Sequence, residues 1–240
     1  MPARGDEARV LERAQGRGGE LVLRGRGSHL EVISNGAFLI STENEASSRA
    51  LVTAALPWLP EGQLRVLIGG LGLGFALDEA LLLQGAQAVT VAELEPCIVS
   101  WFERYGGERA RRVAADGRAR IVIADVYDTL REASEAYDLI CLDTDNGPHW
   151  LVRERNAALY DAGGIALAFS ALRPGGVAVF WAPERYPGFE AALAARFSKV
   201  LAVPATDVVG GRRHCYTMYV ALRERSVAAT SSRRCGHMGE

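Results

Sequence analysis

The alternation of apolar runs with helical stretches between residues 65 and 197 constrains the fold of this chain more than any other feature. The apolar runs lie at 65–70, 88–93, 120–125, 138–143 and 176–182. Continuous apolar strands separated by helices are typical of parallel βαβ units, with helices on both faces of one sheet. Two further runs, at 199–204 and 214–222, are expected to complete the sheet. We therefore predict an α/β fold with a doubly wound, mostly parallel sheet and an antiparallel last strand.

The residues before this alternation have a different pattern. Three short apolar or β-branched runs are separated by Gly25-Arg-Gly27 and Ser34-Asn-Gly36, and an Asn-Gly step between such runs is a strong hairpin signal. They predict a small antiparallel sheet, followed by a helix that begins near Glu45 and ends before Pro57. The predicted organisation is a flexible leader at 1–19, a small N-terminal β-sheet with a linker helix at 20–60, the doubly wound domain at 61–223 and a disordered tail at 224–240.

Composition and charge exclude several classes of protein. The 27 basic and 29 acidic residues give a net charge of −2, and interspersed charges of both signs argue against a nucleic-acid or membrane-surface partner. No apolar run approaches the ~20 residues that a bilayer-spanning helix requires. The charged start is not a secretory signal, and the four cysteines are scattered without close pairs, so we expect a cytoplasmic protein with reduced thiols. The four histidines have no ligand spacing, and no metal is expected.

A glycine-rich turn follows the first strand of the doubly wound sheet and precedes a helix. Gly70, Gly72 and Gly74 form a G-x-G-x-G pattern, and without Cβ atoms the backbone can approach a ligand closely and turn sharply. This turn lies at the carboxyl edge of a doubly wound sheet, where ligands bind near the switch point. The context favours a nucleotide or nucleoside site over a tight turn without a ligand. No G-K-[ST] sequence follows, so the turn is not a Walker loop.

Each of the next three strands ends in an acid: Glu93, Asp125 and Asp143. A single acid at a strand end often caps a helix, but these three meet the glycine turn at one edge of the predicted sheet. An acid at the place of Glu93 can accept hydrogen bonds from both hydroxyls of a ribose. Asp145 would face the same way as Asp143 in an extended chain. Two neighbouring carboxylates would attract a cationic acceptor and raise the proton affinity of one of them.

These motifs, together with Leu172-Arg-Pro-Gly-Gly176, resemble the Rossmann-like class I S-adenosylmethionine-dependent transferase fold. Within that fold the chain is most similar to the spermidine synthase (polyamine aminopropyltransferase) family, which also has a small sheet before the glycine-rich strand. The resemblance covers about residues 20–222. It makes 61–223 a nucleoside-binding catalytic domain.

The resemblance also implies roles for the strand-end residues. Gly70, Gly72 and Gly74 would line a sulfonium nucleoside, and Glu93 would hold its ribose hydroxyls. Asp125 would face the adenine amino group. Asp143 would occupy the position of the family's catalytic acid, which accepts a proton from the attacking amine, and it would also border the cofactor. From its spacing to Asp143 rather than from the resemblance, Asp145 is predicted to be the second catalytic residue, which attracts and binds the acceptor.

The chain departs from the family pattern at three places. Gly72 stands where the family has an aspartate that binds the aminopropyl ammonium. Asp143-Thr-Asp-Asn-Gly-Pro148 replaces the family's Asp-Ser/Thr-Ser/Thr-Asp-Pro sequence, and Glu45-Ala-Ser-Ser-Arg49 replaces its Tyr-His pair. Arg49 in an amine pocket would repel a polyamine. The departures therefore bear on the choice of donor and acceptor.

We predict a transferase that uses S-adenosylmethionine or its decarboxylated form to alkylate a small amine-containing acceptor, in an aminopropyl-type transfer. The alternative is an S-adenosylmethionine-dependent small-molecule methyltransferase, which Gly72 favours. A further alternative is a non-catalytic nucleoside-binding dimer. The family and the edge of the small sheet indicate a homodimer. Trp150 could close over the acceptor as a lid, and Trp181 either packs in the core or borders the pocket.

Overall fold

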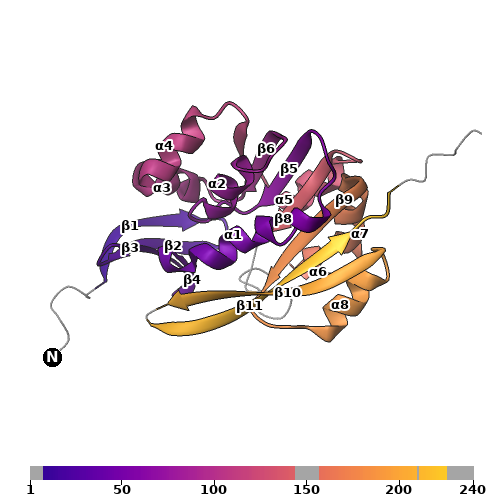
Figure 1. The fold of residues 1–240 in the computed structure, drawn as a ribbon. Helices are drawn as coiled ribbons and strands as arrows, with labels where there is room; N and C mark the ends of the chain where they lie inside the picture. The colour runs from indigo at the N-terminus through magenta and orange to yellow at the C-terminus, as the bar shows by residue number, and fades with distance from the viewer. Residues whose placement is uncertain (1–7, 144–156, 210, 226–240) are drawn as a thin grey trace, which may run out of the picture.

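The computed structural model describes residues 8–143, 157–209 and 211–225, which form two sheets with helices around them (Figure 1). The strands are β1 (Arg9–Gly16), β2 (Gly19–Arg26), β3 (His29–Ser34), β4 (Ala37–Ser41), β5 (Leu64–Gly69), β6 (Ala86–Glu93), β7 (Ala119–Ile123), β8 (Tyr137–Leu142), β9 (Leu172–Ala182), β10 (Lys199–Val209) and β11 (Arg212–Leu222). The helices are α1 (Glu45–Thr53), α2 (Phe75–Leu81), α3 (Pro96–Tyr105), α4 (Gly107–Ala115), α5 (Val126–Glu132), α6 (Ala157–Tyr160), α7 (Ala162–Ala171) and α8 (Pro187–Ala194), with short 3₁₀ turns at Thr42–Asn44 and Leu56–Trp58. None of the helices in these described ranges is both long and apolar enough to cross a membrane.

The seven-stranded sheet has the predicted doubly wound topology. Its strand order is β10-β11-β9-β8-β5-β6-β7. The adjacent strands within the group β5 to β9 all pair in parallel. Strand β11 runs antiparallel to β9. The mostly parallel sheet with an antiparallel last strand is therefore confirmed. Because β5 lies between β8 and β6, the switch point falls at its carboxyl end, where doubly wound sheets form a ligand-binding crevice.

Two hydrophobic layers cover the two faces of this sheet. Along β8, Leu139 and Cys141 pack with the layer that contains α1 and α2, while Ile140 and Leu142 pack with the layer that contains α5 and α7. All four residues are at most 1% exposed. A strand that is buried on both faces is a continuous apolar run in the sequence, which is why β8 could be predicted.

The small sheet is antiparallel, in the order β1-β2-β3-β4, and packs beside the large sheet (Figure 1). The predicted turn at Asn35-Gly36 joins β3 and β4, and both residues have positive φ angles, of 49° and 80°. These are the angles that a two-residue hairpin turn needs and that Asn-Gly supplies most readily. The Asn-Gly step predicted this hairpin correctly because these two residues adopt the positive φ angles of the turn.

The prediction of a flexible leader at 1–19 is wrong for Arg9–Gly16, which form strand β1. Strand β1 pairs antiparallel with β2 across the turn that follows Gly16. Glu12 accepts hydrogen bonds from Trp101 Nε1 at 2.9 Å and from Tyr105 Oη at 2.7 Å, which fixes β1 against α3. The charged residues that suggested a frayed segment belong to an edge strand, which mixes polar and apolar residues because one side meets solvent.

Two helices lie where the sequence pattern shows one. The helical spacing over Pro96–Arg112 predicts a single helix, but α3 ends at Tyr105 and α4 starts at Gly107, with Gly106 between them. Trp101 and Phe102 of α3 are each 3% exposed and pack in the core. The break matters for the site because α4 turns back toward the glycine-rich loop, as described below.

Candidate active site

A cavity of about 720 Å³ lies at the carboxyl edge of the large sheet, where the small sheet adjoins it. Its walls come from the ends of β5, β6, β8 and β9, the loop after β7, strand β4, the start of α1, and Tyr216 of β11. The charged residues among its described lining are Glu93, Glu95, Asp125, Asp143 and Glu184. No Lys, Arg or His occurs in that lining. The cavity therefore has a negative lining suited to a cationic ligand.

The glycine-rich loop contributes Gly70 and Gly72 to the cavity, but Gly74 does not line it. Gly70 has a φ of +91°, and a Cβ there would lie 2.5 Å from the backbone oxygen of Asp143. Only glycine lets the loop pass this close to the end of β8. Gly74 has a φ of +81° and packs against the ring of Phe102, 2.2 Å from the place of an added Cβ. Its requirement for glycine is therefore structural.

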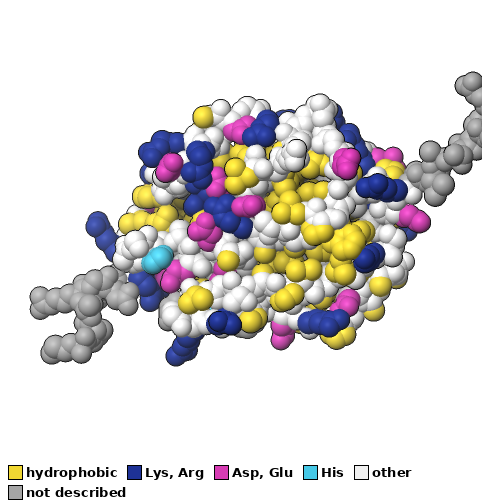
Figure 2. Space-filling view, in the orientation of Figure 1, with side chains coloured by type: hydrophobic (Ala, Val, Ile, Leu, Met, Phe, Trp, Pro, Cys, Tyr) yellow, Lys and Arg dark blue, Asp and Glu magenta, His cyan; other side chains and the backbone are white. Residues whose placement is uncertain are grey.

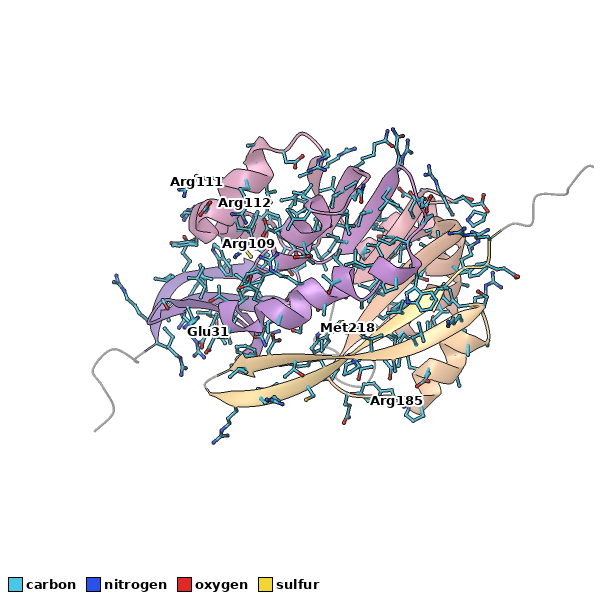
Figure 3. The ribbon with its side chains drawn as sticks, viewed as in Figure 1. Glu31, Arg109, Arg111, Arg112, Arg185 and Met218 are labelled. Atoms are coloured by element: carbon cyan, nitrogen blue, oxygen red, sulfur yellow. The ribbon has the colours of Figure 1, made fainter. Side chains whose placement is uncertain are left out.

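Helix α4 supports this loop from outside the cavity. Arg109, labelled on α4 in Figure 3, donates a hydrogen bond from Nε to the backbone oxygen of Leu73 at 2.9 Å. Its guanidinium carbon lies 3.9 Å from the centre of the Phe75 ring, at the start of α2. The loop is thus held between α2 and α4, and sequence reasoning had no signal for this contact because the partners are 36 residues apart.

Glu93 is 7% exposed at the end of β6 and lines the cavity. Oε2 accepts a hydrogen bond from the Leu71 backbone N–H at 2.7 Å, and Oε1 accepts one from the Glu95 N–H at 2.8 Å. These bonds fix the carboxylate against the glycine-rich loop. A carboxylate accepts hydrogen bonds and does not donate them, which is the chemistry that a ribose diol requires.

The Glu95 carboxylate binds the turn between β1 and β2. Its two carboxylate oxygens accept the backbone N–H of Arg17 at 3.1 and 2.9 Å. The residue also precedes α3 as its N-cap. It therefore ties the β1–β2 turn to the rim of the cavity.

Asp125 both caps a helix and lines the cavity. Its Oδ1 accepts the Tyr127 N–H at 2.9 Å at the start of α5. The same residue belongs to the cavity lining, on the side of Glu93. The helix-cap interpretation and the binding interpretation are therefore compatible.

Asp143 follows β8 and lies partly buried in the cavity wall. Its backbone N–H donates to the Gly69 oxygen at 3.1 Å, which holds the end of β8 beside the glycine-rich loop. Burial raises the pKa of its carboxyl from 3.8 to about 6. A carboxylate with such a pKa can accept a proton near neutral pH. Asp145 and Trp150 lie outside the described residues.

The cavity contains residues that sequence reasoning did not assign. Asn44, Ser47 and Tyr216 also line it. Trp181 lines the cavity too and packs against Tyr216, with ring centroids 5.1 Å apart. Trp181 thus does border the pocket. These residues come from segments far apart in the sequence, and no local pattern joins them.

Arg49 lies outside the lining, so the expectation that it would repel a polyamine is wrong. Its guanidinium binds Glu45 at 2.8 Å, Glu79 at 2.9 Å and Asp78 at 3.0 Å. Asp78 also pairs with Arg112 of α4 at 2.8 Å. Figure 2 shows the result as intermingled basic and acidic side chains over α2 and α4. Helix geometry explains the error, because Arg49 projects toward α2 while Ser47 and Ser48 face the cavity.

Comparison with known proteins supports the fold and the resemblance. No family model matches the chain. It is 36% identical over 89 residues to polyamine aminopropyltransferase 1 of Streptomyces coelicolor, which is 36% of this chain and 17% of that protein. It is 29% identical over 170 residues to a polyamine aminopropyltransferase of Mycobacterium tuberculosis, which is 70% of this chain and 31% of that protein. The chain thus matches less than a third of the length of these two curated relatives.

Two solved structures are similar to this chain over most of its fold. A spermidine synthase in complex with the transition-state analogue AdoDATO aligns with a TM-score of 0.76 at 17% identity, over 90% of this chain and 74% of that one. Spermidine synthase from Thermotoga maritima aligns with a TM-score of 0.71 at 16% identity, over 90% and 72% of the two chains. The chain has the class I, Rossmann-like fold with a small antiparallel sheet. This fold agrees with the resemblance to spermidine synthases that the motifs indicated.

Proposed function

We propose that this chain transfers an aminopropyl group from decarboxylated S-adenosylmethionine to a small amine. The observation that carries the proposal is the charge of the cavity, whose described lining holds five carboxylates and no cationic side chain. The decarboxylated donor has a sulfonium and an ammonium group and no carboxylate, so it complements this lining. S-adenosylmethionine itself would add a carboxylate to an already negative site, which like-charge repulsion disfavours. The lining thus supports aminopropyl transfer over the methyltransferase alternative.

The donor would lie along the ends of β5, β6 and β7. Glu93 is already oriented by two backbone N–H groups and would accept the ribose hydroxyls. Gly70 and Gly72 would pass close to the sulfonium nucleoside, and Asp125 would face the adenine amino group. Gly74 would keep the turn in shape through its contact with Phe102 and would not touch the donor.

Asp143 would act as the general base. The acceptor nitrogen attacks the methylene carbon next to sulfur, the carbon–sulfur bond breaks, and methylthioadenosine leaves with the electron pair. The proton that the nitrogen loses passes to the Asp143 carboxylate. Because the sulfonium is already a good leaving group, orientation and proton removal are the main contributions that the protein must make.

The acceptor would be a polyamine or a similar amine, as the names of the relatives suggest. Protonated amines are drawn to carboxylates, and Asp143 and Glu184 both line the cavity. Asp145 would add to this negative charge. We further propose that the chain works in polyamine biosynthesis in the cytoplasm as a homodimer. Strand β1 lies at the edge of the small sheet, and an edge strand can pair with a second copy of the chain.

The decisive experiment supplies the purified chain with putrescine and either donor. Decarboxylated S-adenosylmethionine should yield methylthioadenosine and an aminopropylated amine, both detected by mass spectrometry, and S-adenosylmethionine should yield neither. Spermidine and cadaverine extend the acceptor panel. Methylated acceptor and S-adenosylhomocysteine in place of methylthioadenosine would overturn the proposal in favour of methyl transfer. Donor binding without any product would favour a nucleoside-binding protein.

A further inference from the structure

Asp207 of β10 is a buried carboxylate directly behind the cavity wall. It is 2% exposed and does not itself line the cavity. Its Oδ1 accepts the backbone N–H of Ser47 at 3.0 Å, and its Oδ2 accepts a hydrogen bond from Asn44 Nδ2 at 3.5 Å. Within the described residues, Asp207 has no cationic partner. Burial of a charge that only neutral donors compensate is costly, so the position calls for a specific explanation.

The contacts of Asn44 fix the direction of its amide. Asn44 Oδ1 accepts the backbone N–H of Ser41 at 3.1 Å. Its Nδ2 therefore faces the opposite side, where it donates to Asp207 and to Tyr216 Oη at 3.3 Å. If the amide rotated, both ends would lose their partners. Asn44 is thus held in one orientation by one residue from β4 and two from the β10–β11 hairpin.

This arrangement leaves the hydroxyl hydrogen of Tyr216 available. Because the phenol oxygen accepts from Asn44, its own O–H can donate to another acceptor. Tyr216 and Asn44 both line the cavity, and the Tyr216 ring packs against Trp181. Strand β11, where Figure 3 labels Met218, carries the Tyr216 ring into this wall. Burial and the charge of Asp207 both raise the pKa of the Tyr216 phenol, so it remains a neutral donor.

We propose that Asp207 is a positioning residue for acceptor binding, which holds Asn44 and Tyr216 in the geometry that the acceptor meets. It joins the start of α1 to a hairpin 160 residues further along the chain. The inference rests on the proposed function only in taking the occupant of this wall to be an amine. Asp207 acts through Asn44 and Tyr216 and does not touch the acceptor.

The test compares Asp207→Asn with Asp138→Asn. Asp138 is also a buried acid, 6% exposed, and also joins separate strands through bonds to Arg65 N and Arg173, but it lies away from the cavity. In Asp207→Asn an NH₂ group would replace one acceptor oxygen of the network. The KM for putrescine should rise on the order of 10-fold, as for the loss of one hydrogen bond to a charged group. Calorimetric affinity for methylthioadenosine should stay within about twofold, and Asp138→Asn should change neither.

Two further measurements separate positioning from general destabilisation. Tyr216→Phe combined with Asp207→Asn should raise the putrescine KM no more than the larger single change, because both act on one network. The Tyr216 phenol, followed by NMR with ¹³Cζ-tyrosine and assigned with Tyr216→Phe, should titrate at lower pH in Asp207→Asn. An Asp207→Asn chain that is folded by thermal melting and has an unchanged putrescine KM would overturn the inference. If the wild-type chain forms no product, the proposed function fails, while an unshifted Tyr216 titration would separately remove the positioning role.

Discussion

At the scale of single residues, Asp143 has the clearest expected effect. Asp143→Asn should reduce turnover by ~10²–10⁴-fold, the usual contribution of a general base, while calorimetric affinity for methylthioadenosine changes little. Since burial holds the pKa of Asp143 at about 6, wild-type kcat should rise with pH through that value as the carboxylate forms. The residual activity of the variant should lack this ascending limb. Near-normal turnover of Asp143→Asn would exclude Asp143 as the base.

The same pKa predicts an opposite effect on stability. The folded-state pKa of Asp143 lies above its unfolded value of 3.8, so the folded chain binds more protons between about pH 4 and pH 6. The wild type should therefore lose stability relative to Asp143→Asn as the pH rises through this window. Thermal melting of both chains at pH 4 and pH 7 measures the difference. A difference in melting temperature between the two chains that is the same at pH 4 and pH 7 would contradict the expectation.

Glu93 tests the donor site. Glu93→Gln keeps the size of the side chain but removes its charge, and it should weaken methylthioadenosine binding by about 1–3 kcal/mol in calorimetric titration. Glu31→Gln is the matched control, because Glu31 is another buried acid, 6% exposed, outside the cavity lining. Equal affinities in Glu93→Gln and the wild type, with both folded, would remove Glu93 from the donor site.

Gly72 tests how the donor ammonium is held. Its φ of +52° lies in the left-handed region, which Asp tolerates better than most residues. A Cβ there would lie 3.1 Å from Ile40 Cδ1, the flexible end of a side chain that can move by a few tenths of an ångström. Gly72→Asp should therefore fold and should raise the affinity for decarboxylated S-adenosylmethionine relative to S-adenosylmethionine. An unchanged ratio of the two affinities would mean that this position does not face the donor ammonium.

At the scale of elements, burial determined which strands and helices could be predicted from the sequence. Strands β5 and β8 are covered on both faces, so their apolar runs were visible in the sequence. Strand β1 was not predicted because it is an edge strand with many charged residues. Its contacts with α3 are made by Glu12, and a charged residue in a sequence usually indicates exposure to solvent. The break between α3 and α4 was missed because Gly106 alone does not reveal that the chain turns.

Glu12 provides the test at this scale. Hydrogen bonds from Tyr105 and Trp101 and the charge of Arg104 lower the pKa of its carboxyl, so its contribution to stability is present above pH 4.5 and is lost as the pH falls. Glu12→Ala should lower the melting temperature at pH 7, and the gap from the wild type should close toward pH 3. Glu20→Ala removes an exposed ion pair in the same hairpin and should have little effect. If Glu12→Ala and Glu20→Ala lowered the melting temperature equally, the contact between β1 and α3 would add no more stability than an exposed ion pair.

At the scale of the whole molecule, the net charge is only −2, but acidic side chains are clustered around the cavity. A cationic acceptor should be drawn there by a field that salt screens, with a screening length of about 10 Å at 0.1 M. The KM for putrescine should therefore rise between about 0.05 and 0.5 M NaCl. Methylthioadenosine has no net charge, so its affinity should hardly change and serves as the internal control. A salt-independent putrescine KM would mean that the acids do not attract the acceptor.

The two halves of the cavity differ in how far sequence could predict them. Gly70, Glu93, Asp125 and Asp143 each follow a strand of one parallel sheet, and topology alone brings such strand ends together. The other half depends on the pairing of Asn44 with Tyr216 across 172 residues. Nothing in the spacing of these residues indicates that they meet. Their contact follows from how the β10–β11 hairpin packs on the start of α1.

The place of β11 inside the sheet has a consequence for synthesis on the ribosome. β11 lies between β9 and β10, although it follows both in the chain. The strand ends that carry the glycine-rich loop and Asp143 can therefore assemble while β9 still has an unpaired apolar edge. That edge, and the wall that carries Tyr216, are completed only when β11 emerges and inserts. The nascent chain should therefore pass through a stage in which the glycine-rich side of the cavity is formed while the sheet is still open, and in this stage it is most exposed to aggregation.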